Sequence, residues 1–108
     1  MTRNEAERLA LKIGENFKKS GASAQVINEM KDLRNYFIEI KDPTVTKILR
    51  LAYEHLENNQ SFDIIPEEFD TEGEMTSFEY LMELITGYDN KYNREELQEY
   101  KQKMLELA

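Results

Sequence analysis

Acidic side chains between residues 63 and 79 are the strongest candidates for chemistry in this sequence. Residues 51–90 contain eleven Asp and Glu and neither Lys nor Arg, whereas residues 1–50 carry ten Lys and Arg against seven acids. Such a base-free stretch attracts a basic partner electrostatically and speeds its association. We therefore expect a small acidic protein-interaction or inhibitor-type protein whose partner is a basic protein. The predicted partner-binding residues are Asp63, Glu67, Glu68, Asp70, Glu72 and Glu74. The alternative is that this charge only keeps the protein in solution.

Residues 68–79, with the sequence EFDTEGEMTSFE, also have the spacing of a cation-binding loop. With Gly73 at the sixth position, Glu68, Asp70, Glu72 and Glu79 fall on ligand positions, so the stretch resembles an EF-hand calcium loop. It departs from that pattern because the first ligand is Glu rather than Asp, and because a proline interrupts the helix that would lead into the loop. A divalent-cation site at these four carboxylates is therefore one hypothesis. An acidic loop followed by a capped helix is the simpler one.

A catalytic centre is not expected. Nucleophilic catalysis needs a nucleophile, a base and an orienting group that converge. His55 is the single histidine, the chain has no cysteine, and no spacing in the sequence indicates such a set. We therefore predict no catalytic residue, no enzymatic activity and no cofactor. His55 is expected to be partly buried on a helix and bonded to a tyrosine or a backbone carbonyl, in a structural role.

Net charge and hydropathy limit the other partners. The net charge of −8 argues against nucleic-acid binding through phosphate neutralisation. No apolar run reaches the ~18 residues of a membrane span, and the N-terminus mixes charged with apolar residues, unlike a signal peptide. We therefore expect a cytoplasmic protein without nucleic-acid or membrane contacts. A second hypothesis is a homo-oligomer, in which the mildly basic first half of one copy docks on the acidic stretch of another. Ile27, Ile38 and Leu11 would supply apolar contacts.

Hydrophobic periodicity predicts a single all-α domain over residues 1–108. We expect a compact bundle of four main helices over residues 5–19, 23–40, 43–58, 77–86 and 94–107, where a break at Asp42 and Pro43 separates the second range from the third. Residues 44–56 have the broadest apolar face and are expected to form the central helix. Residues 36–40 have the alternative of a short strand. A short irregular or helical segment is predicted near residues 61–70.

Local signals predict where the helices begin. Thr2 with Glu5, and Thr76 with Glu79, have the spacing of a capping box, in which a hydroxyl and a carboxylate each satisfy a free backbone N–H. Asn93 is the predicted N-cap of the last helix. These caps agree with the periodicity, and that agreement supports the helical fold class.

Overall fold

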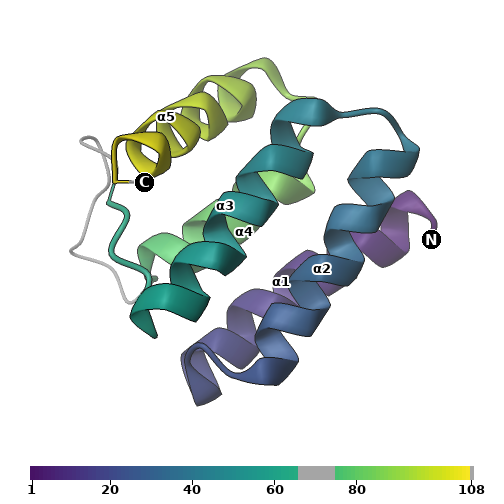
Figure 1. Cartoon of the computed structure of the whole chain (residues 1–108). Coiled ribbons are helices and arrows are strands. Elements are labelled where there is room, and N and C mark those ends of the chain that lie inside the picture. The colour runs from purple at the N-terminus through teal and green to yellow at the C-terminus, as the bar shows by residue number, and fades with distance from the viewer. Residues whose placement is uncertain (66–74, 108) are drawn as a thin grey trace.

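Five α-helices form the described part of the chain. The computed structural model describes residues 1–65 and 75–107, and it contains no strand within them. Its helices are α1 (Arg3–Ser20), α2 (Ala24–Glu39), α3 (Pro43–Asn59), α4 (Ser77–Thr86) and α5 (Lys91–Leu107) (Figure 1). The predicted all-α class is confirmed, and α2 and α3 are separate helices, so the bundle has five. Because α2 continues to Glu39, the strand considered for residues 36–40 is wrong. None of the described helices has the length and hydropathy of a membrane span.

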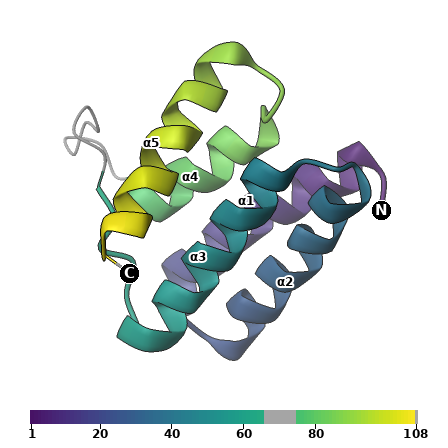
Figure 2. The same ribbon diagram turned by 45° about the horizontal axis from the view of Figure 1, so that its top comes forward.

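The helices pack as a ring around one core. α2 packs against α1 and α3, α5 packs against α3 and α4, and α4 packs against α1. α2 and α5 therefore lie on opposite sides of α3 (Figure 2). Each helix contributes fully buried apolar side chains to the core, among them Ile13, Leu33, Leu49, Leu81 and Leu97. α3 was expected to be central, but it has two close neighbours, like the other helices of the ring.

Most helices begin at the predicted caps. The capping boxes at Thr2 and at Thr76 both form, each closed by the Glu side chain three residues later. The carboxylate of Asp42 accepts a hydrogen bond from the N–H of Val45 at 3.2 Å, and Pro43 occupies the first turn of α3. Proline suits that position because its missing N–H would have no partner inside the helix. The predicted corner between α2 and α3 is therefore confirmed.

The start of α5 differs from the prediction. α5 begins at Lys91 because Asn90 Oδ1 accepts hydrogen bonds from the N–H groups of Tyr92 at 2.9 Å and Asn93 at 3.2 Å. Asn93 was expected to be the cap. Its side-chain amide instead donates to the carbonyl of Leu84 at 3.2 Å, which ties α5 to the end of α4. The cap therefore lies three residues earlier than predicted.

Candidate functional site

Only one of the six predicted partner-binding carboxylates lies within the described residues. Asp63 is exposed, with 68% of its side-chain surface accessible, and its Oδ2 accepts a hydrogen bond from the hydroxyl of Ser61 at 2.9 Å. The other predicted residues lie outside the described residues, and they are Glu67, Glu68, Asp70, Glu72 and Glu74. The site is therefore built from the described residues on either side of them. We call residues 63–74 the acidic segment.

Buried polar contacts hold both ends of the acidic segment. Ile64 is buried, and its carbonyl accepts a hydrogen bond from the Ser77 hydroxyl, at the first turn of α4. The Tyr100 hydroxyl on α5 donates to the backbone carbonyl of Ser77 at 2.8 Å and lies 3.1 Å from Ser77 Oγ. Burial raises the pKa of the Tyr100 hydroxyl well above its usual range, so this group remains a hydrogen-bond donor at neutral pH. Ser77 thus links Ile64, α4 and α5.

Aromatic side chains support the same junction. Phe62 contacts Phe78 edge-to-face, with 5.2 Å between ring centroids, and its ring stacks near Tyr100 at 6.5 Å. The ring centroid of Phe17 on α1 lies 4.3 Å from that of Phe78. Aromatic pairs at such distances add stability beyond the area they bury. Residues 62–64 are therefore fixed against α4 and α5, and Phe78 connects this junction to α1.

His55 joins α3 to this junction. Its side chain is 13% exposed, and its Nε2 accepts a hydrogen bond from the backbone N–H of Asp63 at 3.3 Å. Its Nδ1 lies 3.2 Å from the side-chain nitrogen of Asn59, and its ring contacts Phe62 edge-to-face at 5.8 Å. The partners of His55 are thus an amide group and a backbone N–H, and not the tyrosine or carbonyl that the sequence led us to expect. These contacts position the start of the acidic segment.

A small cleft beside His55 lies between α3 and α5. It has a volume of about 220 Å³, which is below the range of 300–1,000 Å³ that holds typical small-molecule ligands. Its lining includes Leu51, Glu54, Asn58 and Met104. The lining of this cleft contains no serine, threonine, cysteine or lysine beside His55.

Of the four carboxylates in the cation-site hypothesis, only Glu79 lies within the described residues. Its Oε1 accepts hydrogen bonds from the backbone N–H and the hydroxyl of Thr76, both at 3.1 Å. Glu79 thus has the capping role that the simpler interpretation gives it. Glu68, Asp70 and Glu72 lie outside the described residues. Within residues 1–65 and 75–107, no cluster of three Asp, Glu or His side chains is arranged to hold a metal ion.

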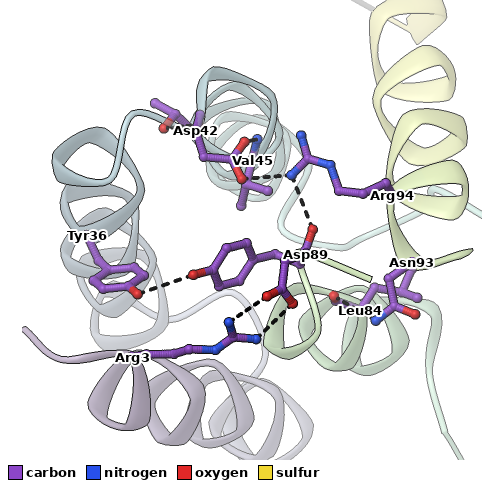
Figure 3. Close-up of polar contacts among 10 residues, drawn as sticks. Arg3, Tyr36, Asp42, Val45, Leu84, Asp89, Asn93 and Arg94 are labelled. Atoms are coloured by element: carbon purple, nitrogen blue, oxygen red, sulfur yellow. Dashed lines mark hydrogen bonds and ion pairs between the residues drawn. The ribbon is translucent and has the colours of Figure 1, made fainter. Parts of the chain in front are cut away.

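A second polar network lies at the far end of α3 (Figure 3). Arg3 donates two hydrogen bonds to the Asp89 carboxylate, at 2.7 and 2.9 Å, and its guanidinium lies 4.7 Å from the centroid of the Tyr88 ring. The Tyr88 hydroxyl lies 3.5 Å from that of Tyr36, and this contact together with burial raises the pKa of Tyr36 to about 12. Arg3 in turn lowers the pKa of Asp89 through the two hydrogen bonds.

Arg94 extends this network to α3. It donates to Asp42 Oδ2 at 2.7 Å and to the carbonyl of Tyr88 at 3.3 Å. Asp42 therefore caps α3 and also forms an ion pair across the bundle. Sequence reasoning found the helix break at Asp42 but missed Arg94, because the two residues lie 52 positions apart and no local spacing pairs them. The network connects the start of α1, the α2–α3 corner and the α4–α5 turn, and its charged groups are already paired.

Comparisons with known proteins give no further information about this site. No family model, no curated protein and no solved structure matches the chain.

Proposed function

We propose that this chain is a non-enzymatic binding protein that holds a basic protein partner through the acidic segment. The single observation that carries this proposal is the charge distribution: residues 51–90 contain eleven acids and no Lys or Arg. A basic surface that approaches residues 51–90 therefore meets no Lys or Arg within this window. Complementary charge of this kind raises association rates and excludes wrongly charged partners.

The described residues at the two ends of the acidic segment support the proposal. Ile64 and Ser77 are buried and bonded to each other, whereas their outer neighbours Ile65 and Met75 are 54% and 37% exposed. Exposed apolar side chains next to carboxylates suit a partner that combines Lys or Arg with apolar groups, because desolvated apolar contacts add affinity to electrostatic attraction. Fixed ends also reduce the conformational entropy lost on binding.

The test compares three proteins for binding to a fluorescent Lys- and Arg-rich peptide at low and physiological salt. The segment variant carries Glu67→Gln, Glu68→Gln, Asp70→Asn and Glu72→Gln. The matched control loses the same four charges from exposed positions on the helices, through Glu15→Gln, Asp32→Asn, Glu39→Gln and Glu95→Gln. We expect the segment variant to bind at least about tenfold more weakly than the control, and added salt to weaken binding of the wild type. Equal losses in both variants would mean that net charge alone attracts the peptide and would refute the proposal.

The partner itself can be sought by affinity capture with the same three baits. A basic protein that the wild type and the control retain, and that the segment variant loses, is the expected result. Recovery of the same proteins by all three baits contradicts the proposal.

A further inference from the structure

The corner between α2 and α3 carries an apolar groove with a basic rim. The groove has a volume of about 420 Å³ and is lined by Phe37, Ile38, Lys41, Asp42, Pro43 and Thr46. Phe37 is buried at its base, whereas Ile38 is 47% exposed at its side. Asp42 is the only acid in the lining, and Arg94 already pairs with it. We call this feature the corner groove.

Two cations of α2 lie on the same helix face as Ile38, and this face carries no acid between them. Lys31, Arg34 and Ile38 follow one another at spacings of three and four residues, so they share one face of α2. Arg34 Nε donates to the carbonyl of Thr46 at 3.3 Å, which places its guanidinium at the edge of the groove. Lys31 Nζ lies 5.2 Å from the centroid of the Tyr53 ring on α3. The exposed acids Asp32 and Glu39 lie on a neighbouring face of α2.

Further cations come from the corner and from α3. Lys41 is exposed and follows α2, and Lys47 and Arg50 lie on α3. Within residues 1–65 and 75–107, no ion pair involves Lys31, Arg34, Lys41 or Lys47, and Arg50 has a single exposed contact, at 3.8 Å, with a glutamate. The groove therefore combines an apolar lining with the cations Lys41 and Arg34, neither of which forms an ion pair within these residues, while its one acid is paired with Arg94. An acidic segment that carries an apolar side chain has the complementary chemistry.

We propose that the corner groove binds the acidic segment of a second copy of this chain. This inference rests on the proposed function and identifies the partner as a second copy, whose corner groove supplies the basic surface. The segment supplies six carboxylates and no base, and its sequence places Ile65 and Phe69 among them. Charge complementarity between the two surfaces is therefore present within one sequence, while the net charge of −8 alone would keep copies apart.

The position of the two surfaces favours contact between copies over contact within one copy. The groove lies at the Pro43 end of α3, whereas His55 holds Asp63 near the Asn59 end. A helix of 17 residues is about 25 Å long, and both ends of the acidic segment are anchored near the Asn59 end of α3. Two copies related by a two-fold axis form both contacts at once, which closes the assembly as a dimer.

The sequence-based candidates for apolar contact are revised accordingly. Ile38 lines the groove, as the self-association hypothesis requires. Ile27 is only partly exposed and packs against the core. Leu11 is exposed but lines a separate groove between α1 and α4. We therefore assign only Ile38 to this contact.

Sedimentation equilibrium at low and high salt tests the proposal with four proteins. The groove variant is Ile38→Asp with Lys41→Glu, and the segment variant is the four-residue variant defined above. Leu11→Asp with Lys18→Glu makes the same chemical change on α1 and serves as the control. Circular dichroism and thermal unfolding show that each variant is folded. We expect the wild type and the control to dimerise at low salt, and each of the other two to dimerise at least about tenfold more weakly.

Mixing the two defective variants gives the decisive measurement. A groove variant with an intact segment and a segment variant with an intact groove can still form one of the two contacts. We expect a mixed dimer that is weaker than the wild-type dimer and stronger than either variant alone. A wild-type protein that is monomeric at low salt up to about 1 mM would overturn the inference, as would a mixture that gives no mixed dimer. If the sedimentation of the variants differs from that of the wild type in a way that does not depend on protein concentration, the contact lies within one copy. That result would overturn the inference as well.

Failure here is distinguishable from failure of the proposed function. The groove variant keeps the acidic segment, so it should bind the Lys- and Arg-rich peptide at least as well as the wild type does. If the wild type is monomeric but the segment variant alone loses that peptide, the partner is a different protein and only the present inference falls.

Discussion

The change Ser77→Ala tests whether one buried hydroxyl holds the base of the acidic segment. Ser77 is buried, and its hydroxyl donates to the carbonyl of Ile64 thirteen residues earlier in the chain. Alanine removes this donor and leaves the carbonyl of a buried residue without its side-chain partner. The Tyr100 hydroxyl keeps its bond to the backbone carbonyl of Ser77, so α4 and α5 remain connected.

The expected loss follows from the cost of an unsatisfied buried polar group. Such a group costs about 1–3 kcal/mol, which is more than the net worth of an ordinary hydrogen bond. For a domain of this size, each kcal/mol lowers the Tm by about 4–8 °C, so we expect a fall of about 4–24 °C. Ala at the first helical turn has good helix propensity, so little of the effect should come from α4 itself.

Thermal and urea unfolding followed by circular dichroism measure this loss. A lower urea midpoint with an unchanged m value would show that stability, and not the extent of unfolding, has changed. Ser61→Ala is the control, because its hydroxyl bonds to the exposed Asp63 and its removal should cost less than about 0.5 kcal/mol. Hydrogen exchange should show faster exchange at Ile65 and Met75 in Ser77→Ala only. Stability within about 0.5 kcal/mol of the wild type would refute the reasoning.

Three further predictions concern the helix contacts. Gly14→Ala should stabilise the protein by about 0.5–1 kcal/mol in urea unfolding, because alanine raises the helix propensity of α1. A Cβ at this position would meet its neighbours on α4 at ordinary contact distances of 3.6–3.8 Å. A destabilised variant would show that α1 and α4 pack too tightly for the added methyl group. Arg94→Ala should lower the free energy of unfolding by about 1–3 kcal/mol, because the Asp42 side chain is only 11% exposed and loses its cation. Arg94→Lys keeps a positive charge and should lose less stability. Equal losses in the two variants would contradict the ion pair. Arg3 lowers the pKa of Asp89, so their contact stabilises the fold above about pH 4 and is lost as pH falls through the lower folded pKa. Arg3→Gln should therefore lower the Tm at neutral pH and have a smaller effect near pH 2, and an equal effect at both pH values would count against this.

The helix ends were predictable because their signals lie within one turn of the chain. A hydroxyl and a carboxylate three residues apart at Thr2 and at Thr76 specify the same local geometry wherever they occur. The start of α5 was not predictable in this way. Asn90 and Asn93 are the same residue type three positions apart, so both fit the cap, and the choice depends on the bond that Asn93 makes to α4.

The polar contacts between helices could not be read from the sequence. Arg3 and Asp89 are 86 positions apart, and the chain offers many other acids to each arginine. Only the packing of the helices selects among them. His55 shows the same limit: its place on a partly buried face was predictable from periodicity, but its partner Asp63 was not, because the turn after α3 has no regular spacing.

The arrangement of charge also bears on how large an assembly of this chain can grow. The corner groove and the anchored ends of the acidic segment lie at opposite ends of α3, so a single contact between copies leaves one groove and one segment free. Such a contact extends into an open chain unless a two-fold arrangement closes it. Each added copy contributes a further net charge of −8, so repulsion rises with every copy while the gain per contact stays constant. The closed dimer satisfies both surfaces with the smallest total charge, and for this reason we expect two copies and no larger species.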